Sequence, residues 1–587
     1  MESSSLPKFF NMGNSSFIKK ALEELKSNDE MKIISELNNL CSELSMASDK
    51  IGEDIKIIDL IKELINLLDK FPFIPEISIM SLNCLNYLLD INPNSTSSII
   101  KFNGIQKIVS MSNNVESIDG VESAIKAIEK MSYENPYVLV EKNAFLNILS
   151  FIDFFDLPLR KTALKACVNM SKRGNSFEYY KNHIEGAIPN LTNLAKLSGN
   201  SDIEKNIVDL AIQCFYNIIF GIKNFGYSMN FNSFCNDIIK YGLLNVLLEN
   251  FIKFINYDFD NVEKNKLSND NVNVDTVKNI LRIFEMFCSM SDNITNLLLN
   301  QNMLEMIYKV IKNEINYNKN DGSKVNGSNT HSLFNELFNL LASFFPTQSN
   351  KDNNKLFKTK IMSDENKHFY KFFSENILSL LIDNILNISS SSTTLGVIKI
   401  INMYCANSSL DYIKQFINDD TLSNTISKML DSKDSSYIIE VLSLVNLIMN
   451  RIPEYFIISF LRDGVLENIS KLQSVEESSL YFSNDYNLYK IPLKYDIKIE
   501  TTSEDTEKKT VNLIRINSMN LMNKYFNGNN IKELIQKSNS KINPIEIINK
   551  LNDYSMILKE NKIIDKKLII SENTFLSISV LSFNIME

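Results

Sequence analysis

The sequence predicts an all-α protein whose short helices repeat and stack into a right-handed α-solenoid. Turns at Gly104, Asn143, Gly186 and Gly242 follow one another at spacings of 39, 43 and 56 residues. That spacing fits the armadillo and HEAT period of roughly 40–47 residues, with one insertion. Gly and Pro number only 15 and 11 among 587 residues, too few for a loop-rich β protein. One such unit cannot bury its apolar side alone, so neighbouring units must stack.

Helical periodicity begins near Met31, after a polar lead-in of residues 1–30 that we expect to be flexible. Ile33, Leu37, Leu40 and Leu44 fall on one stripe of the first predicted helix. Amphipathic segments then alternate with turns to residue 472, where the predicted solenoid ends. The turns inside the repeated units are 102–105, 142–145, 184–189, 240–243, 300–303, 418–421 and 462–465.

Two polar insertions interrupt the predicted solenoid, near residues 256–275 and 314–366. Asn, Lys, Asp and Ser dominate both segments. They offer too little apolar surface to offset the entropy lost on ordering, so we expect mobile loops.

Residues 473–587 form a mixed tail with helical segments near 512–526 and 544–559. The segment Tyr495-Asp496-Ile497-Lys498-Ile499 alternates at period two, which predicts an irregular or β-hairpin excursion near 475–510. Residues 575–585 are apolar and lack the polar face of a terminal cap, so we expect the sequence to be cut short.

Composition and charge exclude several partner classes. The net charge is −9 at pH 7, so we expect neither nucleic acid nor a membrane surface as partner, although the overall charge leaves open a locally basic groove. No apolar run reaches the roughly 18 residues of a membrane span, and no signal peptide begins the chain. The seven cysteines are scattered without a CxxC motif, which predicts reduced, buried thiols in a nuclear or cytoplasmic protein.

The sequence shows no catalytic, metal-binding or cofactor-binding motif. His183, His331 and His368 lie far apart and in different units, which gives little material for a triad or a zinc site. Neither a P-loop nor a dinucleotide-binding glycine motif occurs. We therefore expect no catalytic residue, no metal and no cofactor in this chain.

Asn recurs between apolar residues in the last helix of several units. Asn86, Asn169 and Asn217 are the candidates for a partner-binding groove, in which an Asn amide bonds an extended peptide backbone. The alternative is that each Asn bonds a neighbouring helix. Asp153-Phe154-Phe155 leaves a similar choice between an exposed partner-binding feature and Phe side chains packed in the core.

Residues 145–155, FLNILSFIDFF, and 160–170, RKTALKACVNM, resemble the armadillo region of one group of HECT-type E3 ubiquitin ligases. That group contains the plant ligase KAKTUS and the animal thyroid-hormone-receptor interactor, and its motif reads L-x-Y-L-[DE]-F-F and then Q-R-x-A-L-x-x-A-x-N. Segments 37–45, 187–194, 448–456 and 460–465 resemble further units. Residues 571–579 resemble the start of the group's next helical block.

The resemblance implies a solenoid that docks protein substrates or adaptors in the ubiquitin–proteasome pathway. Arg160, beside the most specific segment, joins the candidate groove residues. The family's catalytic HECT domain takes ubiquitin on a cysteine, and no cysteine follows Cys405 in this sequence. We therefore expect the HECT domain to be absent from this chain. A ubiquitin-conjugating enzyme would then be met through a HECT module outside this chain. The alternative function is a stand-alone armadillo adaptor or scaffold without ubiquitin chemistry.

Overall fold

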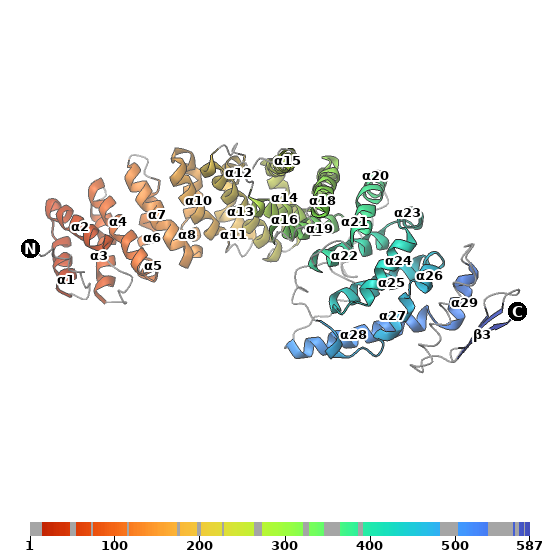
Figure 1. Ribbon diagram of the computed structural model, residues 1–587. Coiled ribbons are helices and arrows are strands. Elements are labelled where there is room, and N and C mark those ends of the chain that lie inside the picture. Colours follow the sequence, from red (N-terminus) through yellow and green to blue (C-terminus); the bar gives the residue numbers. More distant parts are fainter. Residues whose placement is uncertain are drawn as a thin grey trace, which may run out of the picture. The chain divides into compact units, whose positions relative to one another are not determined.

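The structure is a computed structural model that falls into two compact units, Met1–Met290 and Ser291–Glu587, which we call unit 1 and unit 2. Both are built almost entirely from short helices (Figure 1). The residues that it describes are 15–46, 55–71, 74–113, 117–172, 177–196, 201–225, 228–262, 273–320, 328–345, 364–385, 391–481, 503–537, 567–569, 575–579 and 582–586.

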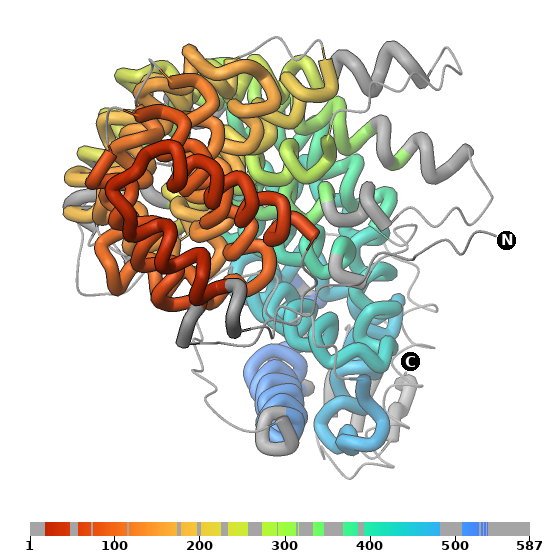
Figure 2. Tube along the Cα trace, turned by 90° about the vertical axis from the view of Figure 1, so that its left-hand side faces the viewer, coloured from red at the N-terminus to blue at the C-terminus, as the bar shows by residue number. Residues whose placement is uncertain are grey.

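In unit 1 the helices come in sets of three from α5 onward. The third helix of each set packs against the third helix of the next, and α2 and α4 continue this row. In Figure 2 the helices of unit 1, coloured red to yellow, lie behind one another as stacked repeats do. The elements are α1 Ser15–Leu25, α2 Glu30–Ser45, α3 Ile55–Lys70, α4 Pro75–Ile91, α5 Ser95–Lys101, α6 Gly104–Met111, α7 Ile118–Glu134, α8 Pro136–Glu141, α9 Ala144–Phe151, η1 Ile152–Phe154, α10 Leu157–Ser171, α11 Phe177–His183, η2 Glu185–Ala187, α12 Ile188–Ala195, α13 Asp202–Phe225, α14 Ser228–Lys240, α15 Leu243–Val262 and α16 Val274–Met290.

Unit 2 repeats this plan, with α19, α22, α25 and α28 packed in a row of third helices. The predicted α-solenoid is therefore confirmed. The elements are α17 Asp292–Asn300, α18 Met303–Asn320, α19 Ser328–Ser343, α20 Asp364–Phe372, the π-helical turn η3 Phe373–Leu378, α21 Ser379–Asn384, α22 Ser391–Asn407, α23 Leu410–Phe416, α24 Asp419–Leu430, α25 Ser435–Arg451, α26 Pro453–Arg462, α27 Val465–Leu472, η5 Glu477–Ser479, α28 Ser503–Lys524, α29 Gly528–Lys537, β1 Lys567–Ile569, β2 Phe575–Ser579 and β3 Ser582–Met586.

All seven predicted turns join consecutive helices, and five of them use a left-handed residue. The φ angles are 57° at Asn103, 60° at Asn143, 58° at Asn302 and 77° at both Gly242 and Gly464. Gly adopts this conformation without a Cβ clash, and Asn tolerates it better than most residues. The turns thus recur because the sequence supplies Asn or Gly where the chain must reverse.

Three boundaries of the sequence prediction are wrong because helices extend past them. The lead-in 1–30 contains α1, whose Ile18, Ala21 and Leu25 are buried. The segment 314–366 contains the end of α18, the whole of α19, with Leu333 and Phe338 buried, and the start of α20. In 256–275, α15 continues to Val262 and α16 begins at Val274, while residues 263–272 lie outside the described part.

The predicted end of the solenoid at residue 472 is also too early. Helix α28 packs on α25 and α27, and α29 packs on α26, so the helical array reaches Lys537. Residues 503–510 are helical rather than part of a β excursion, and residues 482–502 lie outside the described part. The expected helix near 544–559 also lies outside it.

Near the C-terminus the structure has a small antiparallel sheet with the order β1-β2-β3. Leu568 pairs with Ile578, and Phe575 pairs with Met586. The resemblance implies a helical block at 571–579, and this expectation is wrong at β2. There Leu576 and Ile578 alternate with serines at period two, which favours a strand.

Candidate partner-binding face

The third helices of unit 1 expose one side each. Helix α10, for example, lies between α7 and α13 and packs on α8 and α9 behind it. We call the exposed side of α4, α7, α10, α13 and α16 the ladder face. Because these helices lie side by side, the ladder face is a continuous surface that an extended chain can cross.

The local sequence explains how α10 is placed. Its N-cap residue Asp156 accepts a hydrogen bond from the N–H of Leu159 at 2.9 Å, and Pro158 fits the first turn, where no N–H is needed. Ala163, Leu164 and Cys167 are fully buried on the opposite side of the helix. The polar residues of α10 are thereby turned toward the ladder face.

The three Asn candidates bond neighbouring ladder helices. The Nδ2 of Asn86 donates to the carbonyl of Ser123 on α7 at 2.9 Å. Asn169 donates to the Oγ of Ser132 on α7 at 3.0 Å. Asn217 donates to the carbonyl of Val168 and the Oγ of Ser171 on α10, at 3.2 and 3.0 Å. These amide donors hold the ladder together, so their role as groove residues stays a prediction.

Arg160 is engaged with the turn before its own helix. Its Nε donates to the carbonyl of Phe155 at 2.8 Å, and its Nη2 donates to the carbonyl of Asp153 at 2.7 Å. The guanidinium therefore closes the C-terminal end of η1. Its role toward a partner also stays a prediction.

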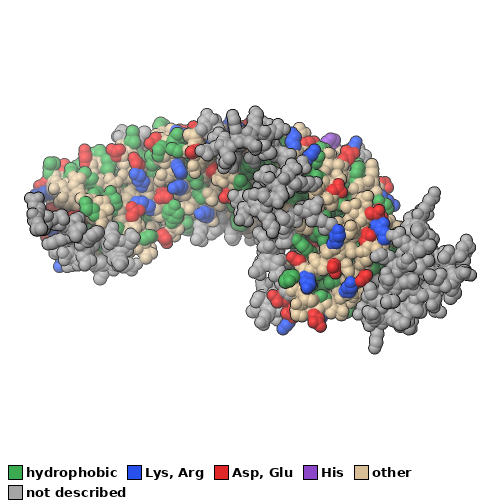
Figure 3. Space-filling view, viewed as in Figure 1, with side chains coloured by type: hydrophobic (Ala, Val, Ile, Leu, Met, Phe, Trp, Pro, Cys, Tyr) green, Lys and Arg blue, Asp and Glu red, His purple; other side chains and the backbone are tan. Residues whose placement is uncertain are grey.

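A basic stripe runs along the exposed side of α10. Lys161, Lys165 and Lys172 are spaced by four and seven residues, which places them on one side of a helix. Lys165 and Lys172 are exposed, and Lys161 is half-buried. From Leu157 to Lys172 the sequence contains no Asp or Glu. Figure 3 shows Lys and Arg side chains gathered over the region that Figure 1 labels α7 and α10.

Lysines of the neighbouring ladder helices are neutralised by carboxylates. On α7, Lys126 pairs with Glu122 at 2.6 Å, and Lys130 pairs with Asp90 of α4 at 2.7 Å. Lys223 of α13 pairs with Glu285 of α16 at 3.2 Å. Among the described residues, no carboxylate pairs with the basic stripe. Within the described part of the chain, the lysines of the basic stripe are thus not matched by a carboxylate.

Exposed aromatic rings stand on both neighbours of α10. Tyr133 on α7 is 62% exposed, and its O–H donates to Glu129 at 2.9 Å, which raises the pKa of Tyr133. On α13, Phe220 is 46% exposed and stacks on Tyr216 with a centroid distance of 5.8 Å. The guanidinium of Arg282 lies 5.8 Å from the Tyr216 ring. Rings of this kind commonly anchor bound proteins.

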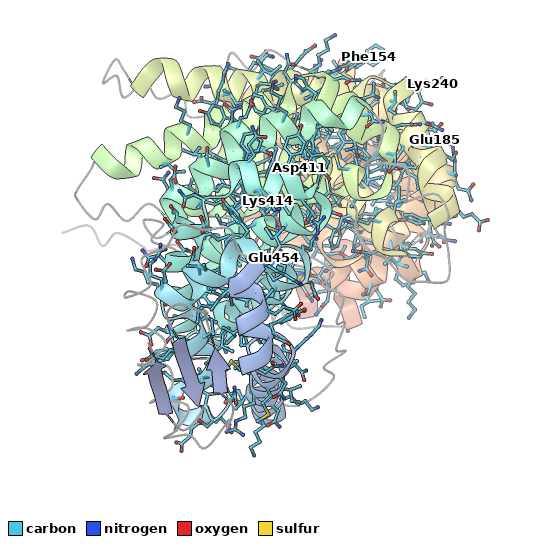
Figure 4. The ribbon with its side chains drawn as sticks, turned by 90° about the vertical axis from the view of Figure 1, so that its right-hand side faces the viewer. Phe154, Glu185, Lys240, Asp411, Lys414 and Glu454 are labelled. Carbon is cyan, nitrogen blue, oxygen red and sulfur yellow. The ribbon has the colours of Figure 1, made fainter. Side chains whose placement is uncertain are left out.

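In the segment Asp153-Phe154-Phe155 one ring packs in the core and the other is exposed, so a partner-binding role for Phe154 stays a prediction. Phe155 is buried, while Phe154 is 70% exposed and reaches away from the ribbon at the edge of the molecule in Figure 4.

The first helices of two successive sets in unit 2 bear both charge signs. Figure 4 labels Asp411 and Lys414 on α23 and Glu454 on α26.

The described residues offer little for other kinds of site. Within them, no group of three or more His, Cys, Asp or Glu side chains is placed to hold a metal ion. No helix in the described segments is both long and apolar enough to cross a membrane. All seven cysteines are described; six are buried, and Cys41 is half-buried.

Sequence reasoning missed the basic stripe, although a signal for it was present. Lysines at 161, 165 and 172 without an intervening acid are visible in the printed sequence. Their significance depends on the carboxylates of α4, α7 and α16, which lie far away in sequence. Only the packing of the ladder shows which lysines those carboxylates neutralise.

Comparison with known proteins shows that part of this chain is similar to E3 ubiquitin ligases. Residues 8–141 match the family described as E3 ubiquitin-protein ligase TRIP12-like, TPR repeats. The E3 ubiquitin-protein ligase UPL3 of Arabidopsis thaliana is 26% identical over 188 residues, 32% of this chain and 10% of that protein. UPL4 of the same plant is 25% identical over 143 residues, 24% of this chain and 10% of that protein.

The matched region spans about a tenth of the length of these curated relatives. The family match and the two plant ligases confirm the resemblance to HECT-type E3 ligases that the sequence predicts, as a likeness to TRIP12/UPL-type repeat regions.

Solved structures agree on the fold. An engineered protein, target OR497, is 14% identical with a TM-score of 0.54, and the match covers 86% of this chain and 99% of that one. A chain from work on the interaction between cadherin and beta-catenin is 11% identical with a TM-score of 0.51, covering 86% and 87%. At these identities the likeness establishes the helical-repeat architecture alone.

Proposed function

We propose that this chain is the partner- or substrate-docking solenoid of a HECT-type E3 ubiquitin ligase. We further propose that its ladder face receives an extended, acidic segment of the bound protein. The observation that carries this function is the basic stripe of α10, which no described carboxylate neutralises, on a continuous helical surface. The resemblance to TRIP12/UPL-type ligases supports a role in ubiquitination.

The dimensions of the ladder suit an extended peptide. Packed helices lie roughly 8–10 Å apart, and an extended chain advances roughly 3.3–3.6 Å per residue. Five ladder helices therefore accommodate roughly ten to twelve residues. Acidic side chains would pair with Lys161, Lys165 and Lys172, and apolar ones would lie on Tyr133 and Phe220. Many weak contacts of this kind bind selectively without a deep pocket.

Asn86, Asn169, Asn217 and Arg160 take a supporting role in this proposal. Asn169 links the basic stripe to α7. Its Oδ1 accepts a hydrogen bond from the Nζ of Lys172 at 3.3 Å, and its Nδ2 donates to Ser132 of α7. Asn86 and Asn217 hold the spacing of the ladder helices. Arg160 fixes the turn from which α10 starts.

Docking would contribute to ubiquitination through effective concentration. A protein held on the solenoid keeps its lysines near the thioester of a HECT domain, which we place outside these 587 residues. The ubiquitin-conjugating enzyme would meet that domain rather than the solenoid. We place the protein in the nucleus or cytoplasm, with neither nucleic acid nor membrane as partner.

Peptide binding tests the proposal directly. We expect a fluorescent twelve-residue peptide rich in Asp and Glu to bind the 587-residue chain, with fluorescence anisotropy as the readout. The triple variant Lys161→Glu/Lys165→Glu/Lys172→Glu should weaken binding by roughly tenfold, since three ion pairs of about 0.2–1 kcal/mol each sum to about 0.6–3 kcal/mol and each new Glu also repels the acidic peptide.

The control is Lys142→Glu/Lys196→Glu/Lys253→Glu, an equal charge change at exposed lysines outside the ladder helices. We expect it to weaken binding less than threefold. Equal losses in both variants, or preference for a single-stranded oligonucleotide over the peptide, would contradict the proposed site.

The alternative is a stand-alone adaptor or scaffold without ubiquitin chemistry. The burial of six of the seven cysteines agrees with both functions, because the ligase proposal places the thioester outside these residues. Ubiquitination of the captured protein by the natural protein isolated from its own cells would favour the ligase. Capture without ubiquitination would favour the adaptor.

A further inference from the structure

Two cysteines from different helices are in contact where α2 packs on α4, the first ladder helix. The Sγ of Cys41 on α2 lies 3.2 Å from the Sγ of Cys84 on α4. The two residues are 43 positions apart, and the packing of α2 on α4 brings them together. A disulfide needs an S–S distance of about 2.05 Å, so a small side-chain movement of about 1 Å is enough.

The two thiols differ in access. Cys84 is fully buried, whereas Cys41 is half-buried. A small oxidant would therefore reach Cys41 first. Cys84 would be shielded from solvent and would meet only its partner sulfur.

The thiols also differ in acidity. The hydrogen bond between the two thiols lowers the pKa of Cys41, while the same contact and burial raise the pKa of Cys84. The Cys41 thiolate is the better nucleophile of the two near neutral pH. Other cysteines of the ladder lack this combination: Cys167 and Cys214, also on consecutive ladder helices, are both fully buried, and burial raises the pKa of each.

We propose that Cys41 and Cys84 form an oxidisable pair that hydrogen peroxide converts into a disulfide joining α2 to α4. The Cys41 thiolate attacks one peroxide oxygen, so that an S–O bond forms, the O–O bond breaks, and hydroxide leaves and takes up a proton. The Cys84 sulfur then attacks the sulfenic sulfur of Cys41. The S–S bond forms, the S–O bond breaks, and a second water leaves with the Cys84 proton. Two thiols and one peroxide thus yield one disulfide and two waters.

The disulfide would stabilise the end of the ladder. It closes the chain between α2 and α4, with α3 inside the loop. Cross-linking limits the unfolded chain, so we expect the melting temperature of unit 1 to rise by roughly 5 °C. A thiol reductant should reverse the change.

Peptide mapping without reductant tests the proposal on the 587-residue chain. Trypsin cuts beside Lys32, Lys50, Lys70 and Lys101, so the disulfide joins the peptides 33–50 and 71–101. After mild peroxide treatment, mass spectrometry should detect this linked pair, two hydrogens lighter than the sum of the peptides. The Cys84→Ala variant should instead accumulate a Cys41 sulfenic acid that dimedone traps.

Cys167 and Cys214 provide the internal control, because they should remain thiols under the same treatment. Linkage of Cys41 to a second copy of the chain would overturn the proposal. So would equal dimedone labelling of Cys41 with and without Cys84, or unreacted thiols at a peroxide dose that oxidises the denatured chain. The mapping of the unsubstituted chain decides the matter even if Cys84→Ala folds poorly.

Discussion

At the residue scale, the turn before α6 places two requirements on the sequence. One residue must adopt a left-handed φ angle, and the next has no room for a Cβ atom. Asn103 meets the first requirement with φ 57°. The next residue, Gly104, meets the second: a Cβ there would lie 2.7 Å from Cδ1 of Ile65 and 2.8 Å from Cγ2 of Ile99. One turn thus combines an angular and a steric constraint.

The Gly104→Ala variant should therefore destabilise unit 1 by about 1–3 kcal/mol, the usual cost of overpacking. Asn103→Gly in the same turn should change stability by less than about 0.5 kcal/mol, because Gly accepts positive φ. Urea unfolding followed by far-UV circular dichroism measures both. An Ala variant as stable as the parent would show that Ile65 and Ile99 relax without cost.

Asn86 tests whether the ladder amides are structural. Its Nδ2 donates to a buried carbonyl on α7, so Asn86→Ala should cost about 1 kcal/mol. Asn66→Ala, at an exposed Asn whose partner is Glu63 on its own helix, should cost much less. Thermal unfolding beside the peptide-binding assay separates the roles: lost binding without lost stability would identify Asn86 as a contact residue.

The positions of the ladder Asn residues could be predicted from the sequence, but their hydrogen-bond partners could not. Apolar neighbours place Asn86, Asn169 and Asn217 on packed helices. The direction of an amide, however, depends on which backbone groups the adjacent helix offers. The same holds for Cys41 and Cys84, whose contact needs the register between α2 and α4.

At the element scale, α22 and α25 are joined by a buried ion pair. Lys399 is 6% exposed and Glu440 is 2% exposed, with Nζ and Oε1 3.7 Å apart. Burial lowers the pKa of Lys399 and raises the pKa of Glu440, although each charge attracts the other. Desolvation therefore outweighs the attraction, and the pair costs stability when both groups are charged.

Replacing both partners should reveal this cost. In the pH range where both groups are charged, Lys399→Met/Glu440→Leu should be as stable as the parent or more stable by about 1–4 kcal/mol. Glu440→Leu alone should lose about 3–5 kcal/mol, because Lys399 then lacks this carboxylate. Thermal and urea unfolding report all three proteins. A double variant less stable than the Glu440→Leu variant would contradict the argument.

The sign of the pH dependence is set by the directions of the two pKa shifts. With its pKa raised on folding, Glu440 contributes stability below its unfolded pKa and loses that contribution as pH rises through the folded value. With its pKa lowered, Lys399 contributes stability above its unfolded pKa and loses it as pH falls through the folded value. The advantage of the double variant should therefore shrink as pH falls toward the ordinary Glu pKa of about 4.3.

Elements with strong apolar periodicity could be predicted, whereas their limits could not. Charged residues fill the first turns of α28, a composition typical of a polar tail, yet Ile514, Leu521 and Met522 are buried. Arg515 also attaches α28 to the preceding segment: its Nε and Nη2 donate to the carbonyl of Val475 at 2.9 and 2.6 Å. The sequence predicts the helix near 512–526, but the polar composition of residues 503–511 conceals where it begins, and the sequence does not predict its packing on α25 and α27.

A chain that ends after Tyr481 should consequently have an exposed apolar side on α25 and α27. We expect a lower melting temperature for unit 2 and increased binding of a hydrophobic dye, compared with a chain that ends after Lys537. The latter is the control, since it keeps α28 and α29 and removes only residues 538–587. Matching melting curves would mean that α28 adds nothing to the array.

At the scale of the whole molecule, repetition made the architecture predictable and left the function open. Each set of helices contacts mainly its neighbours, so a local period is enough to indicate a solenoid. A binding surface depends on the residues in which the sets differ. The basic stripe is such a difference, because α10 has lysines without the carboxylates that α7 and α13 have nearby.

The burial of the cysteines throughout the chain bears on whether it can accept ubiquitin itself. A ubiquitin thioester needs an accessible thiolate, and burial raises the pKa of Cys235 and Cys405 to about 12. We expect the 587-residue chain, incubated with E1, E2, ATP and ubiquitin, to form no adduct that a thiol reductant releases. Cys41→Ser is the decisive companion, because Cys41 is the half-buried thiol with a lowered pKa. An adduct that Cys41→Ser abolishes would make the solenoid itself a ubiquitin carrier. An adduct retained in Cys41→Ser but lost with another single cysteine would mean that a buried helix face opens in solution.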